Sequence, residues 1–180
     1  MTLPTTAIED LLGLAIRHVN AGQVARARVL CEQAVKAHPP HPAVQQLLAV
    51  IDLQQGDANS AAEWAMASLA LRPDHPPTQR VAADAWFQVS LERHEAHDLA
   101  GEASALREVL RIAPERVEAE VNLGIALQDA GEMTDAMRAY GRAFRLREDT
   151  FGRIAHALAT PETGRLWLNL DALRAELRVA

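Results

Sequence analysis

Two short helices joined by a turn can be read from residues 120–143, EVNLGIALQDAGEMTDAMRAYGRA. Leu123 and Leu127 are four residues apart, which is the spacing of one buried helix face. Gly131 interrupts this pattern, because glycine readily adopts the left-handed backbone that ends a helix. A second helical face with the same spacing then runs through Tyr140. The stretch therefore predicts a helical hairpin.

The same hairpin pattern recurs along the chain at an interval of 34 residues. The positions that repeat are Ala15, Ala49 and Ala83; Leu14 and Leu48; Gly22 and Gly56; Ala27 and Ala61; and Pro39 and Pro73. A fixed period of this length is typical of stacked supersecondary units. We therefore predict an all-α helical-hairpin solenoid in a single domain over 1–180. Its repeats are expected at about 8–41, 42–75, 76–116 and 117–150, with a C-terminal cap over 151–180.

The third repeat is longer than the others, because Pro73 and Pro114 are 41 residues apart and not 34. Asp98 has the position of a cap for a second helix over 99–112, so the seven extra residues are expected to lengthen the first helix past Phe87. The extension adds about two helical turns and keeps the apolar face in phase. Its tip, residues 94–98, is either a partner-specific protrusion or a neutral length variant.

Composition narrows the classes of function. Hydrophobic residues make up 49% of the chain but aromatic residues only 4%, so the interior must be built mainly from small and aliphatic side chains. The net charge of −6, with basic residues scattered among acidic ones, argues against nucleic acid as a partner. No apolar run approaches membrane-spanning length, so no membrane insertion is expected. Cys31 is the only cysteine and cannot form an internal disulfide, and we expect a cytoplasmic protein.

The sequence carries no recognisable catalytic motif. A glycine-rich phosphate loop, a nucleophile elbow and paired catalytic carboxylates are all missing, so we predict that the protein is not an enzyme and has no cofactor. His94 and His97, like His38 and His41, lack an obvious third ligand, so no metal site is expected. Cys31 lies on an inner helix face, where a buried, inert thiol is expected.

The repeating residues resemble the tetratricopeptide repeat family, whose pattern is a small residue in the first helix, glycine at the turn, two alanines in the second helix and proline at the exit. The resemblance covers about residues 8–147 and is closest over 120–143. It departs where the early aromatic residue is absent, where Glu148 replaces the exit proline, and where Ser68 replaces one alanine. The resemblance implies a right-handed solenoid of about four repeats whose first helices line a concave groove.

That groove is the predicted binding site for another protein. The residues that would point into it are Leu12, Ile16, Gln46, Val50, Leu53, Arg80, Asp84, Phe87, Val121, Asn122, Ile125 and Gln128. The best-known groove of the family holds an acidic C-terminal tail through lysines and asparagines. Here the positions are mainly aliphatic, with one cation and one asparagine, so they favour a partner's amphipathic helix or apolar peptide. Alternatively, these side chains pack between neighbouring first helices.

The sequence thus favours a non-catalytic protein–protein interaction adaptor. The alternatives are a self-associating scaffold, which would form a homo-oligomer, and a regulatory partner of an enzyme such as a transferase. The segment after Arg147 is expected to cover the apolar end of the stack through Phe151, Trp167, Leu173 and Leu177. A second interpretation is that this segment pairs with another molecule or folds back into the groove.

Overall fold

The structure is a computed structural model that describes residues 5–159 and 169–180. Within these two ranges every regular element is a helix and there is no strand, which confirms the prediction of an all-α chain. Trp167, which the sequence places in the C-terminal cap, lies outside the described residues. The chain divides into two compact units, Met1–Ala85 and Trp86–Ala180, and each is described by itself.

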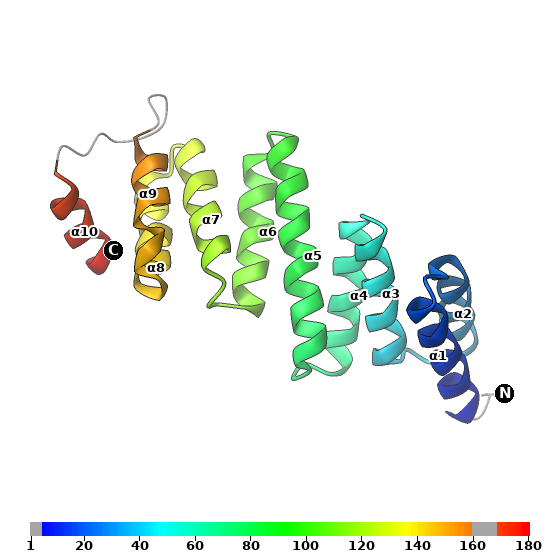
Figure 1. Cartoon of the computed structure of the whole chain (residues 1–180). Coiled ribbons are helices and arrows are strands. Elements are labelled where there is room, and N and C mark those ends of the chain that lie inside the picture. Colours follow the sequence, from blue (N-terminus) through cyan, green and yellow to red (C-terminus); the bar gives the residue numbers. More distant parts are fainter. Residues whose placement is uncertain (1–4, 160–168) are drawn as a thin grey trace. The chain divides into compact units, whose positions relative to one another are not determined.

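The first unit contains two helical hairpins and the first half of a longer helix (Figure 1). Its elements are α1 (Thr5–Asn20), α2 (Val24–Ala37), α3 (Pro42–Gln54), α4 (Ala58–Leu71) and the beginning of α5 (Pro76–Glu95). In each hairpin the two helices pack against each other, and α3 also packs against α2 and α1. Gly22 and Gly56 close the two turns with φ of 72° and 81°, a backbone conformation that glycine adopts without strain.

Small side chains form the contact surfaces of the first hairpin, as predicted. Ala15 and Ala27 are fully buried, and Ala34 is buried next to Cys31. An alanine at such a position lets two helix axes approach closely, and a larger side chain would force them apart.

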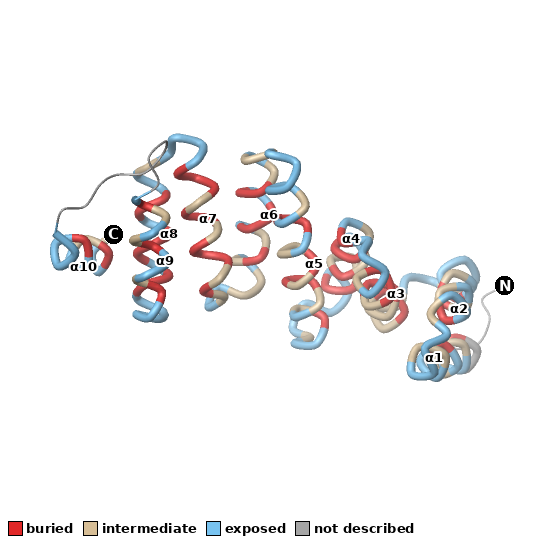
Figure 2. The backbone as a smooth tube through the Cα atoms, turned by 45° about the horizontal axis from the view of Figure 1, so that its top comes forward, coloured by how far each residue is buried: buried red, intermediate tan, exposed pale blue. Residues whose placement is uncertain are grey.

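The second unit continues from the second half of α5 to the end of the chain. Its further elements are α6 (Leu99–Ile112), α7 (Val117–Asp129), α8 (Met133–Leu146), the short 3₁₀ helix η1 (Glu148–Thr150), α9 (Phe151–Leu158) and α10 (Leu170–Val179). Figure 2 shows buried positions recurring along α7 and α8, while the turn between them is exposed. Gly131 closes that turn with φ of 80°.

Gly124 marks the closest approach in the α7–α8 hairpin. A Cβ atom added there would lie 2.3 Å from Cε1 of Tyr140, a distance that real Cβ contacts do not show. The atoms nearest to such a Cβ belong to the fully buried Tyr140 ring, which needs the space that the missing side chain leaves.

The seven extra residues lengthen α5, as predicted. α5 has 20 residues, whereas the first helices α3 and α7 have 13 each. The second helices α2, α4, α6 and α8 all have 14 residues. Asp98 caps α6 by accepting a hydrogen bond of 2.9 Å from the backbone N–H of Gly101, which satisfies one of the unpaired donors of the helix start.

The last two helices cover the end of the second unit. α9 packs against α7, and α10 packs against α8, with Leu173 and Leu177 fully or almost fully buried. Asn169 caps α10 by accepting hydrogen bonds from the backbone N–H groups of Asp171 and Ala172. For the described residues, the predicted capping helix is confirmed. In the described ranges, no helix combines the length and the apolar character needed to cross a membrane.

Candidate functional site: the first-helix groove

The twelve predicted groove residues lie on first helices, but their exposure differs widely. In the first unit, Leu12, Gln46, Val50, Leu53 and Asp84 are half-buried, while Ile16 and Arg80 are exposed. In the second unit, Phe87, Asn122 and Ile125 are half-buried, whereas Val121 and Gln128 are buried. Because the two units are separate bodies, each presents its own part of this surface.

On α1 and α3 of the first unit, the predicted groove residues other than Gln46 are aliphatic. Ile16 of α1 is 43% exposed, an unusually large fraction for an isoleucine. Val50 and Leu53 lie half-buried on α3, the first helix that packs beside α1. Leu12 packs against the core cluster of this unit, so it contributes little to the surface that a partner could contact. We name Ile16, Val50 and Leu53 the aliphatic row.

A buried ion pair connects α3 to α2. Asp52 of α3 is completely buried and pairs with Arg28 of α2, whose side chain is 32% exposed. Arg28 also donates a hydrogen bond of 3.2 Å to the side-chain oxygen of Gln55. A buried carboxylate requires such a partner, because its transfer out of water costs several kcal/mol. The pair joins the first hairpin to the second.

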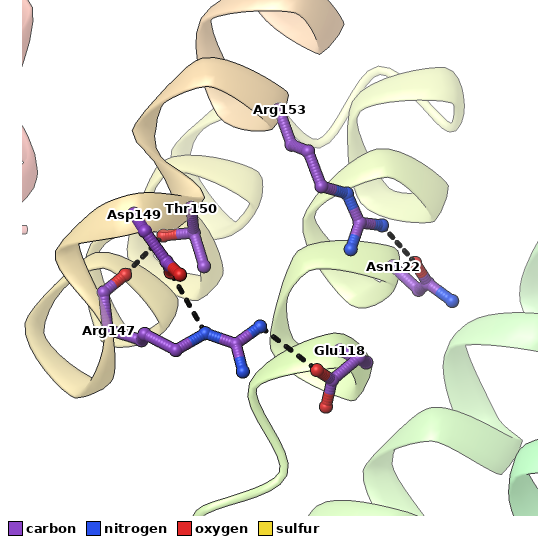
Figure 3. Close-up of polar contacts among 6 residues, drawn as sticks. All are labelled: Glu118, Asn122, Arg147, Asp149, Thr150 and Arg153. Carbon is purple, nitrogen blue, oxygen red and sulfur yellow. Dashed lines mark hydrogen bonds and ion pairs between the residues drawn. The ribbon is translucent and has the colours of Figure 1, made fainter.

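In the second unit, the corresponding part of α7 is polar and already paired (Figure 3). Arg147 donates a hydrogen bond of 3.0 Å to Glu118 and pairs with Asp149 at 2.9 Å. Arg153 of α9 donates a hydrogen bond of 3.4 Å to the side-chain oxygen of Asn122. A hydrogen bond from its own backbone N–H, followed by the contact with Arg147, lowers the pKa of Glu118. The face of α7 is therefore anionic and bridged to the next element.

A pocket of about 290 Å³ lies between α7 and α9. Its lining residues are Ile125, Gln128, Asp129, Arg153, His156 and Ala157. Of the predicted groove residues, the structure thus brings Ile125 and Gln128 together here. Arg153 and His156 belong to it as well, and the sequence analysis missed them because it assigned α9 to the cap. The helical spacing of Ile154 and Leu158 was the available signal for a further helix here.

Two predicted groove residues have structural surroundings instead. Val121 is 0% exposed, so it belongs to the core and cannot contact a partner. Gln128 is 2% exposed; its Nε2 donates to the backbone oxygen of Ala157 at 2.9 Å, and its Oε1 accepts from the Tyr140 hydroxyl at 3.1 Å. Val121 and Gln128 are buried because other helices, among them α8 and α9, pack against α7. Phe87 is covered on one face by the guanidinium of Arg116, 4.4 Å from its ring centre.

The histidine and cysteine candidates show no sign of metal or nucleophile chemistry. Nδ1 of His94 lies 3.0 Å from Oε2 of the buried Glu102, and in the described part of the chain no three potential metal ligands gather. His41 precedes the first residue of α3. Cys31 is 1% exposed, and burial raises the pKa of its thiol to about 11, which keeps it protonated and unreactive at neutral pH.

Comparison with known proteins identifies the repeat. Two family models described as tetratricopeptide repeat match residues 18–85 and 121–157, which together make up more than half of the chain. No curated protein sequence matches the chain.

Solved structures with similar folds include several MamA proteins. MamA AMB-1 is 21% identical, with 97% of this chain and 93% of that chain covered and a TM-score of 0.59. MamA MSR-1 is 22% identical, with 96% and 98% covered and a TM-score of 0.56. A MamA RS-1 double mutant is 13% identical, with 95% and 92% covered and a TM-score of 0.60. At these identities the likeness concerns the fold. Taken with the two matching family models and the helical hairpins, it shows that the chain belongs to the tetratricopeptide repeat family.

Proposed function

We propose that the protein is a non-catalytic adaptor that binds the apolar face of a partner's amphipathic helix on the aliphatic row of its first unit. The observation that carries the proposal is the 43% exposure of Ile16 beside α3, which carries Val50 and Leu53. Exposed aliphatic side chains on neighbouring helices offer an amphipathic helix a surface on which to bury its own apolar residues.

The contrast between the units favours this location. The α7 part of the groove consists of side chains that already have partners, such as Glu118 with Arg147 and Asn122 with Arg153. A partner binding there would have to break these bonds. The aliphatic row has no polar groups to desolvate, so contact with an apolar helix face is favourable at about 25 cal/mol per Å² of buried apolar area.

The test compares a double change within the aliphatic row with a single change outside it. Helical peptides are selected from a displayed library on the wild-type chain, and their affinities are measured by fluorescence anisotropy. Ile16→Glu combined with Val50→Gln should weaken binding roughly tenfold or more, because truncating a central apolar contact costs about 1–2 kcal/mol or more. Leu14→Glu is the matched control, since Leu14 lies on α1 and is 36% exposed but is not part of the row.

The proposal would be contradicted if both variants weakened peptide binding equally, or if neither variant weakened it. The alternatives have their own readouts. A self-associating scaffold would show concentration-dependent mass in sedimentation, and a regulatory partner would change the activity of an enzyme such as a transferase with which it copurifies. A cytoplasmic location remains part of the proposal and is checked by cell fractionation.

A further inference from the structure

Four arginines gather around one cleft of the second unit, on second helices and not on the first-helix groove. The cleft has a volume of about 550 Å³. Its lining residues are Arg107, Leu110 and Arg111 of α6; Glu120, Leu123 and Leu127 of α7; and Asp135, Arg138 and Arg142 of α8. On each of α6 and α8 the two arginines are four residues apart, so they share one helix face.

The arginines of the cleft are paired to different degrees. Among the described residues, Arg107 has no hydrogen-bond or ion-pair partner. Arg111 pairs with Glu108 at 2.8 Å and Arg138 with Asp135 at 2.8 Å, and all four of these side chains are more than a third exposed. Exposed pairs of this kind contribute little free energy, so their guanidinium groups can bind a new anion without a large loss.

The floor of the cleft holds an acceptor without a donor. Glu120 is 4% exposed, and its Oε1 accepts a hydrogen bond of 2.7 Å from Nε of Arg142. Its other oxygen, Oε2, is buried without a hydrogen-bond partner. This oxygen has almost no accessible surface, so a ligand in the cleft cannot reach it, and the bond from Arg142 is what offsets the burial of the Glu120 carboxylate.

We infer that this cleft binds an acidic polypeptide segment of a partner protein, with side-chain carboxylates on Arg107 and Arg111. With Glu108 counted, four cations face three carboxylates, and the excess positive charge of Arg107 favours an anionic ligand although the chain as a whole has a net charge of −6. Guanidinium groups bind planar carboxylates through two parallel hydrogen bonds.

The lining residues favour a peptide over a phosphate group. A phosphate dianion concentrates two charges at one point, whereas the single charges of peptide carboxylates are spread along a chain and can each meet one arginine. Leu110, Leu123 and Leu127 provide apolar surface for the methylene groups of acidic side chains. None of the lining residues is aromatic, so the cleft offers no surface on which the bases of a nucleic acid could stack.

The experiment uses the full chain and four probes in isothermal titration calorimetry. The probes are a peptide of alternating Glu and Ala, its counterpart of Gln and Ala, inorganic phosphate, and a single-stranded oligodeoxythymidine. We expect the Glu/Ala peptide to bind in a salt-sensitive way and the other three probes to bind at least about tenfold more weakly. When the Glu/Ala peptide is added, the NMR chemical shifts of backbone amides should change in α6 and α8.

Two variants of the cleft make the assignment specific. Arg107→Ala with Arg111→Ala should weaken the Glu/Ala peptide about tenfold or more, and Arg107→Lys with Arg111→Lys should retain part of the affinity, because lysine keeps the charge but loses the planar fork. Arg17→Ala with Arg26→Ala, on the first unit, is the charge-matched control and should have no effect. The Ile16 and Val50 variant should also bind this peptide normally, which separates this site from the proposed function.

Several outcomes would overturn the inference. These are the absence of Glu/Ala binding to the wild-type chain, equal binding of phosphate or of the oligonucleotide, and shift changes outside α6–α8. If the arginine variants instead abolish self-association in sedimentation, the occupant is a second copy of this chain and the inference is wrong. If the alanine variant fails to fold, the inference is tested by the affinity of the lysine variant and by the NMR shift changes of the wild-type chain.

Discussion

Arg145 of α8 donates a hydrogen bond of 3.2 Å to the backbone carbonyl of Leu177 in α10. The last carbonyls of a helix have no partner within the helix, and a cation near them also interacts favourably with the helix dipole. Gly141, one turn earlier on α8, lies against the same end of α10. The C-terminal helix is therefore attached by a hydrogen bond and a close backbone approach.

We expect Gly141→Ala to loosen α10. An added Cβ would lie 2.9 Å from the backbone oxygen of Leu177, and a backbone atom cannot move aside as easily as a flexible side chain. Amide hydrogen exchange in α10 should become faster, with α7 and α8 less affected. Gly152→Ala is the control, since a Cβ there meets nothing within 4 Å and alanine favours the helix by about 1 kcal/mol. Unchanged protection of α10 would show that the close approach does not hold it.

The buried pair of Arg28 and Asp52 should be strongly coupled. Arg28→Met leaves a buried carboxylate without its cation and should lower the free energy of unfolding by about 2–4 kcal/mol. Asp52→Leu should cost less, because Arg28 is partly exposed and keeps its bond to Gln55.

The double variant should recover much of the loss, since both charges are then gone. Urea denaturation of the four proteins gives the coupling energy, which we expect at about 1–3 kcal/mol. Additive effects would mean that the two side chains do not depend on each other.

Glu102 should make stability fall as pH rises above 4.5, because its pKa is raised in the folded chain. Burial raises the pKa of its carboxyl above the ordinary 4.5; His94 opposes this shift and Asp129 adds to it. A group with a raised pKa in the folded state binds its proton more tightly there than in the unfolded chain. Its stabilising contribution is therefore complete below pH 4.5 and is lost as pH rises through the raised value.

Glu102→Gln, which carries no charge, removes this dependence. Relative to wild type, the variant should gain stability at pH 7 compared with pH 4, as measured by urea midpoints at both values. A relative loss at neutral pH would mean that the contact with His94 outweighs burial.

His97 occupies the turn position that glycine holds in the other hairpins. Its φ is 55°, against 81° for Gly56, the equivalent turn residue of the second hairpin. A side chain in this region costs about 1–2 kcal/mol, partly offset because glycine loses more entropy on folding. His97→Gly should therefore raise the free energy of unfolding by about 0.5 kcal/mol, and Gly56→Ala should lower it by about 1 kcal/mol. Thermal unfolding of both variants checks the pair, and a destabilised His97→Gly protein would contradict the argument.

The sequence was sufficient for most of the fold because the repeat depends on local chemistry. Glycine at Gly22, Gly56 and Gly131 specifies left-handed turns, and Asp98 and Asn169 specify helix starts. It placed His97 in the turn before Asp98 but did not indicate its left-handed backbone, because glycine and not histidine is the usual signal for that conformation.

The site was harder to predict, because exposure depends on which elements pack beyond the repeat. Helical spacing places Val121 and Ile125 on the same side of α7, yet one is buried and the other borders a pocket. The four arginines of the second-helix cleft looked scattered in the sequence, since 107, 111, 138 and 142 come together only when α6 and α8 pack on α7. Such three-dimensional grouping leaves no contiguous motif.

The side-chain amide of Gln128 on α7 holds one wall of the pocket beside α9 in place. Gln128 connects three helices at once, through Ala157 on one side and Tyr140 on the other. Moving α9 away would break the hydrogen bond from Nε2 of Gln128 to the Ala157 carbonyl and leave that amide N–H without its partner, a cost of about 1–3 kcal/mol. The wall that α9 gives this pocket is therefore held in place by a buried hydrogen bond, and widening the pocket would cost that bond.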